Sequence, residues 1–279
     1  MNATQDGWEL PITENQLARL TDDMTEAHHE TLPAMQASAA ELAEEIRTRS
    51  DGVQGPGRPA TDRRRFLLGA GGGAAAFLLA ACSGGGGDTS AAALDADSSA
   101  SPSPSGSSSG STYTGDLQLV ALSVALENQA VGAYRATLKA AKAGKLGKVP
   151  PAVATFVTTA MSQHADHAKA WNAVLTGAGK PAIHDVPLSD QNQLMAALGK
   201  ATSVGAAAKL ALRLEDQAAQ TYLYATAHVK SVAGVSTAAT IAPVEAMHAA
   251  ILHFVLGQYP VPDAFLPVNS AAKPSLLTV

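Results

Sequence analysis

Apolar residues recur every three or four positions in four long stretches of the C-terminal half, which is the spacing of one face of an α-helix. The stretches cover about 116–142, 151–177, 203–231 and 236–257, and glycine or proline lies in each connection between them. Glycine and proline commonly separate helices. The pattern therefore predicts four long helices.

A few ionisable residues fall on these apolar faces. In the first stretch, Val120, Val124, Glu127 and Val131 follow one another by steps of four, three and four, so Glu127 lies on the apolar face. The last stretch contains a Glu-x-x-His pair, whose spacing puts both side chains on one face of a helix. The faces of the other three stretches carry His164, His167, Glu215, Glu245 and His248.

The two halves of this region repeat each other. The sequence LENQA at 126–130 matches LEDQA at 214–218, an offset of 88 that also relates Tyr134 to Tyr222. We therefore predict two similar helical hairpins with an approximate twofold axis, which places the ionisable residues at equivalent depths. An offset of 81 relates two further pairs, His164 with Glu245 and His167 with His248.

Glutamate is scarce beyond Cys82. The 197 residues that follow contain only Glu127, Glu215 and Glu245, and each lies within an apolar stripe. A solvated helical surface normally carries many glutamates, so these three have a buried role. Because an unpaired buried carboxylate is costly enough to change its own pKa, a neutralising cation is the simplest partner. The pattern favours a metal site inside the bundle.

Three shorter segments complete this region. Residues 190–198 have the pattern of a short helix in the connection between the second and third stretches. Pro243 falls inside the fourth stretch and removes one backbone donor, so we expect a kink one turn before the Glu-x-x-His pair. The prolines of 261–279 predict an extended C-terminal tail.

The N-terminal part has a different composition. Residues 1–61 are acidic, and apolar residues recur at helical spacing over 14–48, which predicts a weak helix. We interpret His28 and His29 as lone surface histidines. A misassigned start codon is an alternative explanation for the whole extension.

Residues 62–82 have the order of a bacterial export signal. The run RRRFL resembles the twin-arginine motif, with Arg63, Arg64, Phe66 and Leu67 as its residues. An apolar run of about 16 residues follows, which is short for a membrane-spanning helix. It ends in Leu-Ala-Ala-Cys at Cys82, which resembles the lipobox of exported lipoproteins.

The signal resemblance implies export by the twin-arginine machinery, cleavage before Cys82 and a lipid on that cysteine. The domain would then lie at the outer face of the cytoplasmic membrane, and an uncleaved anchor would leave it on the same side. Twin-arginine export carries folded proteins, so a metal would be acquired before export. Residues 83–115 are rich in glycine, serine and proline, which predicts a disordered tether.

Charge and cysteine content exclude some functions. The formal net charge is −5, but half of the 24 acidic residues lie before residue 63. From Cys82 onward, twelve acidic residues face twelve lysines and arginines. The chain has no stripe of basic residues, so its charge pattern does not indicate a nucleic-acid partner. The single cysteine excludes an intrachain disulfide.

The helical region resembles the ferritin-like domain family, in the form found in exported bacterial proteins and related to desiccation-associated proteins. The resemblance covers about 116–267 and is strongest over 241–252 and 262–265. It implies an all-α, ferritin-like four-helix bundle over 116–260, built from two helical hairpins and preceded by the signal and the linker. Its ligand set is one Glu from each of two helices and Glu-x-x-His from the other two.

Carried onto this chain, the resemblance makes Glu127 and Glu215 the single-helix carboxylates and Glu245 and His248 one complete pair. The second pair departs from the family, because the position of its glutamate holds His164, followed by His167. Three carboxylates balance the charge of two divalent cations less well than four carboxylates would. A bridging hydroxide, a single metal or an unequal pair would each resolve the difference.

The resemblance implies iron, or another divalent metal such as manganese or zinc. The imidazole ligands shift the preference toward the later divalent ions of the first transition-metal row. If the chain is an enzyme, it is a ferroxidase-like oxidoreductase; sequestration of metal is the other implied activity, and a stress or desiccation role belongs to the same family. The alternative is a metal-free, non-catalytic bundle that binds a partner or the envelope. A small homo-oligomer suits a tethered domain better than a closed shell. We expect Tyr134 and Tyr222 in the core and no ligand role for Asp166, His184, His228 or His253.

Overall fold

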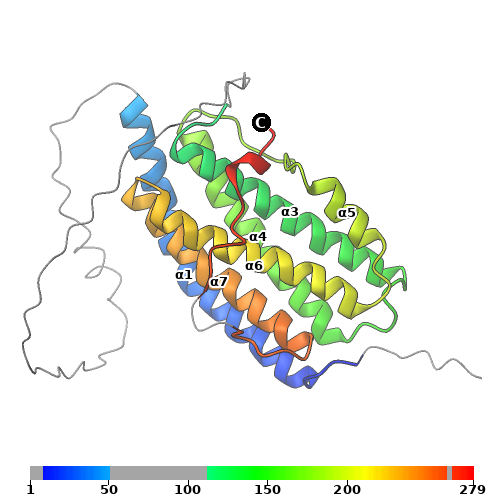
Figure 1. Ribbon diagram of the computed structural model, residues 1–279. Helices are drawn as coiled ribbons and strands as arrows, with labels where there is room; N and C mark the ends of the chain where they lie inside the picture. Colours follow the sequence, from blue (N-terminus) through cyan, green and yellow to red (C-terminus); the bar gives the residue numbers. More distant parts are fainter. Residues whose placement is uncertain (1–8, 51–111, 263–265) are drawn as a thin grey trace, which may run out of the picture. The chain divides into compact units, whose positions relative to one another are not determined.

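The computed structural model describes residues 9–50, 112–262 and 266–279. These ranges form six α-helices and one short 3-10 turn, and they contain no strand, which confirms the all-α prediction. The helices are shown in Figure 1 as α1 (Glu14–Ser50), α3 (Asp116–Lys142), α4 (Pro151–Gly177), α5 (Gln191–Gly199), α6 (Val204–His228) and α7 (Val232–Val255).

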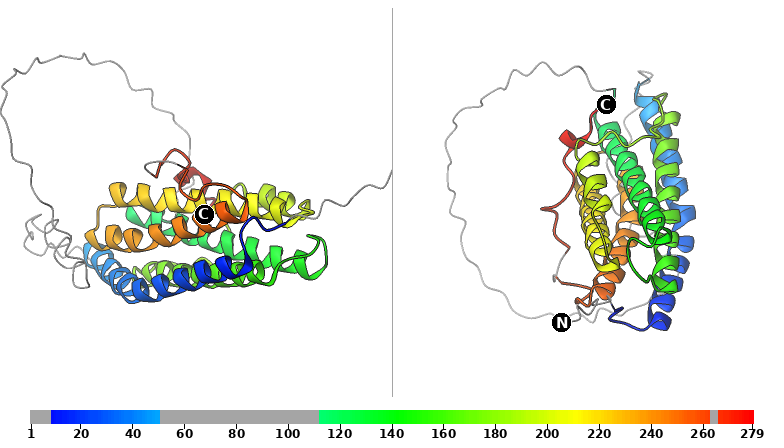
Figure 2. Two further views of the ribbon diagram at one scale, coloured as in Figure 1. Left: turned by 90° about the horizontal axis from the view of Figure 1, so that it is seen from below. Right: turned by 90° about the vertical axis from the view of Figure 1, so that its right-hand side faces the viewer.

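Two helical hairpins make the bundle, as the sequence repeat predicts. α3 packs along α4, α6 packs along α7, and α3 and α6 bring the hairpins together. α4 and α7 have few close backbone contacts with each other, and α1 packs on both of them. In Figure 2, α1 (blue) runs along α4 and α7 for most of their length. The architecture is therefore a four-helix bundle with a fifth helix in the groove between α4 and α7.

Local sequence signals explain where the helices begin. The hydroxyl of Ser203 accepts a hydrogen bond from the backbone N–H of Ala206 at the start of α6, and Ser231 does the same at the start of α7. These bonds satisfy backbone donors that the first helical turn leaves free. α4 begins with Pro151, whose fixed φ suits the first helical position.

The N-terminal helix is longer and better packed than the weak helix that the sequence predicts. Thr13 and Gln16 form a reciprocal capping box at its start. Its buried residues fall on one helical face and include several small or polar side chains, which makes its apolar pattern weak. They are Leu17, Thr21, Met24, His28, Met35, Ser38, Ala39, Leu42, Ala43 and Ile46.

The C-terminal tail packs against the bundle rather than simply extending over it. Ala272 is buried in a small apolar cluster with Leu122 and Leu126 of α3. The backbone N–H of Ala272 donates to Thr221 of α6 at 2.8 Å. The 3-10 turn Pro274–Leu276 follows, and Leu188 forms an isolated bridge with Leu277. The tail therefore closes the bundle on the side of α3 and α6.

The last helix continues through its internal proline. Pro243 is exposed, whereas its neighbours Ile241, Val244 and Glu245 are buried. The missing donor of Pro243 therefore faces away from the core, where solvent can satisfy the freed carbonyl.

Among the described residues, one helix is long and apolar enough to cross a membrane. It is α7, with a mean hydropathy of 1.4 over its most apolar window, of which 56% is buried inside the structure. The core helix of a bundle has the same length and composition, and α7 occupies that position here.

We predict that Gly177→Ala destabilises the protein by about 1–3 kcal/mol, because a Cβ there would lie 2.7 Å from Cβ of Ala43 in α1 and would overpack the contact. The matched control is Gly132→Ala in α3, where the new methyl group has nothing within 4 Å. The control should be neutral or stabilising by about 0.5–1 kcal/mol. Urea unfolding of both variants measures the difference, and equal effects would contradict the observed α1–α4 contact.

Candidate metal centre

Six ionisable side chains from all four helices of the bundle converge in its core. α3 and α6 each carry one, α4 and α7 each carry two, and none is more than 1% exposed. They are Glu127, His164, His167, Glu215, Glu245 and His248. The structure therefore brings together all six residues that the apolar stripes single out.

His164 lies between the two single-helix glutamates. Its Nδ1 is 2.7 Å from Glu127 Oε2, and its Nε2 is 3.1 Å from Glu215 Oε1. Its Nδ1 is also 3.7 Å from Glu245 Oε2. One imidazole thus spans the centre at the position where the family resemblance expects a glutamate.

The donors form two overlapping groups of four, and within each group the ligand atoms lie within 4.8 Å of one another. We name each group after the histidine that belongs to it alone. The His167 group consists of Glu127, His164, His167 and Glu245. The His248 group consists of His164, Glu215, Glu245 and His248. Because the groups share two residues, they define two adjacent positions for a cation.

Both ring nitrogens of His248 lie at hydrogen-bond distance from acceptors. His248 Nδ1 is 3.2 Å from Glu215 Oε2 and 3.2 Å from Glu245 Oε2. His248 Nε2 is 2.7 Å from Gln163 Oε1, which orients the ring. The sequence analysis missed Gln163, although its place four residues before His167 puts it near the same face of α4.

The His167 group contains two buried atoms that lack a hydrogen bond. His167 Nδ1 lies 2.8 Å from Glu245 Oε1 and 3.6 Å from Glu127 Oε1. The geometry of these contacts does not make a hydrogen bond, so His167 Nδ1 and Glu245 Oε1 both stay unsatisfied in the core. Nitrogen and oxygen atoms of this kind suit a divalent transition metal. The donor set therefore fits a metal ion, best in the His167 group.

Two buried tyrosines connect the hairpins through the centre. Tyr134 of the first hairpin donates to Glu215 of the second, and Tyr222 of the second donates to Glu127 of the first. Trp171 Nε1 donates to the hydroxyl oxygen of Tyr222 at 3.0 Å. The repeat thus produces a crossed pair of bonds that holds each single-helix carboxylate in place.

Neighbouring opposite charges outweigh burial in setting the direction of the pKa shifts in the centre. Burial alone would raise the pKa of Glu127, but the charges of His167 and His164 lower it to about 2. Burial alone would lower the pKa of His167, but Glu127 and Glu245 raise it to about 9. The same opposition raises the pKa values of His164 and His248. Without a metal, the centre is an ion-paired cluster of carboxylates and imidazolium groups.

The remaining histidines behave differently from one another. His28 is 2% exposed, so its interpretation as a surface histidine is wrong, and its ring centroid lies 5.2 Å from that of His167. Its Nε2 is 3.4 Å from Asp166, whose side chain is partly exposed. His228 contacts its own helix and His253 contacts Gln258. Neither belongs to the centre.

Other predicted functional residues cannot be placed. Cys82 and the signal residues Arg63, Arg64, Phe66 and Leu67 lie outside the described residues, so their roles stay predictions.

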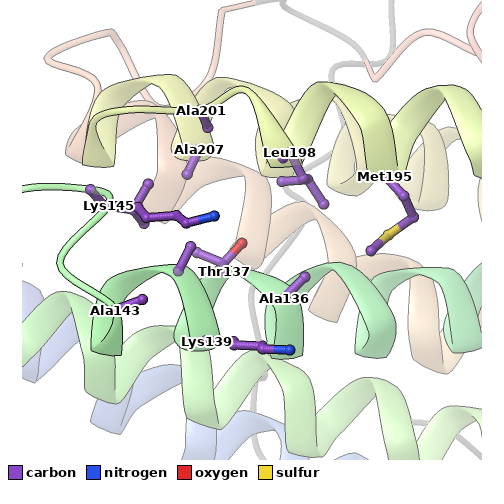
Figure 3. Close-up of a pocket in the computed structure, with 12 residues that line it drawn as sticks. Ala136, Thr137, Lys139, Ala143, Lys145, Met195, Leu198, Ala201 and Ala207 are labelled. Atoms are coloured by element: carbon purple, nitrogen blue, oxygen red, sulfur yellow. The ribbon is translucent and has the colours of Figure 1, made fainter.

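Several cavities lie along the described part of the bundle, and the two described here do not include any of the six donors in their lining. A cavity of about 270 Å³ lies between α3, α5 and the start of α6 and includes Lys139 and Lys145 in its lining (Figure 3). An apolar cavity of about 40 Å³ includes Tyr134, Phe156 and Leu252. The smaller one approaches the His248 group, because Tyr134 donates to Glu215 and Phe156 lies edge-on to His248.

A helical bundle with a buried carboxylate and histidine centre defines the class of ferritin-like proteins. The family model for the Ferritin-like domain matches residues 115–258, and the chain belongs to this family. No curated protein and no solved structure matches the chain significantly.

The ion pairs predict how the metal-free protein responds to pH. The raised pKa of His167 contributes stability that is full below pH 6.5 and is lost as the pH rises through about 9. The lowered pKa of Glu127 contributes stability that is full above pH 4.5 and is lost as the pH falls toward about 2. Chemical unfolding of chelator-treated protein should therefore show a maximum between these limits. An unfolding free energy that stays constant from pH 6.5 to 9 would contradict the ion pairs.

The crossed tyrosines offer a matched pair of substitutions. Tyr222→Phe removes a hydrogen bond from both Glu127 Oε1 and Trp171 Nε1, whereas Tyr134→Phe removes one from Glu215 alone. Because a buried unsatisfied group costs about 1–3 kcal/mol, we expect both variants to lower the unfolding free energy and Tyr222→Phe to lower it more. Urea unfolding at pH 6 measures the order, and the reverse order would contradict the bonding.

Proposed function

We propose that this chain is a ferritin-like protein that binds one or two transition-metal ions, exported and tethered to the outer face of the cytoplasmic membrane. One observation carries the metal function: six buried donors converge in two overlapping groups, and two atoms of one group have no hydrogen bond. The donors face one another rather than solvent.

The first ion belongs in the His167 group. Glu127, His164, His167 and Glu245 would hold it, and His167 Nδ1 and Glu245 Oε1 would gain the partner that they lack. Both nitrogens of His248 already have partners, so a cation in the His248 group has to replace existing bonds.

Charge balance supports one tightly held ion. One divalent cation against three carboxylates leaves one negative charge, which a single protonated histidine cancels. His248 suits that role, because Glu215 and Gln163 accept from its two nitrogens. A second divalent cation requires neutral histidines and leaves an excess positive charge in a low-dielectric core. A bridging hydroxide would be needed to offset it.

The identity of the metal follows from two opposing preferences. Membership of the ferritin-like family favours iron, whereas a donor set with three imidazoles favours zinc or another late divalent ion. Bound iron would supply a one-electron redox centre, and bound zinc would supply only a stored or structural ion. Oxidation of Fe(II) and sequestration of metal are the two activities that fit these alternatives.

The tether rests on the order of residues before the bundle. An arginine pair, an apolar run and Cys82 precede the glycine- and serine-rich stretch that leads to α3. This order supports lipidation of Cys82 after export by the twin-arginine machinery. A small homo-oligomer and a role in stress or desiccation remain predictions from the resemblance.

A second candidate is a non-catalytic bundle that binds a partner. One observation favours it: three glutamates and three histidines compensate one another without any metal. A degenerate centre of this kind would be purely structural.

Metal titration of the full-length protein separates the candidates. We expect about one Zn(II) per chain to bind tightly in calorimetry. Glu127→Gln should weaken this binding by about 100-fold or more, because the substitution removes a ligand of the His167 group. Loss of a residue that only orients a ligand typically weakens metal binding by about 10–100-fold. Glu215→Gln, its counterpart in the repeat, should weaken it by about tenfold or less.

Three results would count against the proposal in different ways. Absence of stoichiometric Zn(II), Mn(II) or Fe(II) binding would remove the metal function and leave the structural bundle. A larger loss for Glu215→Gln would move the first ion to the His248 group. Equal losses would indicate a pair of ions that bind together.

A further inference from the structure

The helix α1 stands in an unusual place in the chain. It ends at Ser50, before residues 62–82, whereas the bundle begins at Asp116, after them. Even so, α1 and the bundle belong to one compact unit. A sequence that has an export signal after α1 therefore also uses α1 as part of its fold.

α1 fills the groove between the two helices that carry four of the six donors. It runs parallel to α4, since Glu14 meets Ala152 near one end and Ala43 meets Gly177 near the other. It runs antiparallel to α7, since Pro11 meets Gly257 and Leu42 meets Gly234. α4 and α7 have few close contacts with each other, so α1 separates this groove from solvent (Figure 2).

The bundle contains small residues where α1 approaches most closely. A Cβ on Gly177 would lie 2.7 Å from Cβ of Ala43, and a Cβ on Gly234 would lie 3.4 Å from Leu42. These distances are at or below ordinary contact, so neither glycine leaves spare room for a side chain. The bundle surface is thus shaped to receive α1.

Polar contacts also fix the position of α1. Glu14 Oε2 accepts from the backbone N–H of Ala152 in the first turn of α4, at 3.2 Å. Ser231, which caps α7, donates to Glu45 Oε2 at 2.6 Å. Both glutamates lie at helix N-termini, where a negative charge is stabilising.

The middle of α1 lies against the metal centre. The ring of His28 is 5.2 Å from the ring of His167, between centroids, and His28 is buried. His28 Nδ1 has no hydrogen-bond partner, like His167 Nδ1 beside it. α1 therefore closes the side of the centre on which the His167 group lies.

We propose that α1 is a removable fifth helix that closes the metal centre in the precursor and leaves it open once the chain is cut before Cys82. The proposal rests on the proposed function for the metal site and for the cut. α1 and the bundle can remain packed only while both are on one side of the membrane. An ion loaded under α1 is held until α1 undocks for export, and the mature protein exchanges metal through the vacated groove between α4 and α7.

The experiment weakens α1 docking in the full-length protein without changing the bundle. Met24→Glu with Met35→Glu puts two charges into the α1 interface, because both methionines are buried. Gln36→Glu with Ala40→Glu adds the same charge on the exposed face of α1 and is the control. Each protein is loaded with Zn(II), and release to a chromogenic chelator is timed. We expect release from the first variant to be about tenfold faster or more, because local opening limits access, and release from the control to match the parent.

Each outcome has a separate meaning. Equal release rates from all three proteins would overturn the closing role of α1. If none of them binds Zn(II), the proposed metal function fails, and detachment of α1 is then tested by hydrogen exchange of the unaltered full-length chain. In that experiment, the backbone amides of α1 should exchange with solvent when α1 detaches, while those of α3 and α6 stay protected. Exchange of α1 only with the whole bundle would overturn the proposal. If the double variant does not fold, Gly177→Ala repeats the release test from the other side of the interface.

Discussion

Neutralisation of three carboxylates in a water-free core is the constraint on which this structure depends. Glu127, Glu215 and Glu245 are at most 1% exposed, and a buried carboxylate without a partner is unstable as an ion. The bundle meets this constraint with three imidazoles from α4 and α7 and with two tyrosines that cross between the hairpins. Because each glutamate has partners on other helices, charge neutralisation also fixes how the helices pack.

The replacement of a family glutamate by His164 changes what such a centre can do. Four carboxylates would repel one another without cations, so they would depend on two metal ions. Here His164 lies between Glu127 and Glu215 and carries the compensating charge itself. The centre is therefore stable without metal, and an ion has to displace protons from imidazoles in order to bind. Under the proposed metal function, that competition favours a single ion and higher pH.

The groove between α4 and α7 links the centre to the rest of the chain. Those two helices supply both histidine-containing pairs, yet α1 covers them. Its glutamates accept from a backbone N–H in the first turn of α4 and from Ser231, the N-cap of α7, and its His28 lies beside His167 near the middle. Residues of α1 are thereby part of the environment of the candidate centre. Under our proposal, metal retention and processing are coupled through this helix interface.

The sequence by itself determined the four bundle helices, the repeat and the six converging donors. Amphipathic periodicity is a local property, and rare charged residues on an apolar face have only the core to occupy. The sequence did not determine the packing of α1, the burial of His28 or the contact of Gln163 with His248. These depend on contacts between residues far apart in the chain, and α1 in particular presents alanine, serine and threonine, whose apolar signal is weak. Only the tertiary structure decided them, because a small residue is buried when a matching surface, such as the one at Gly177 and Gly234, lies opposite it.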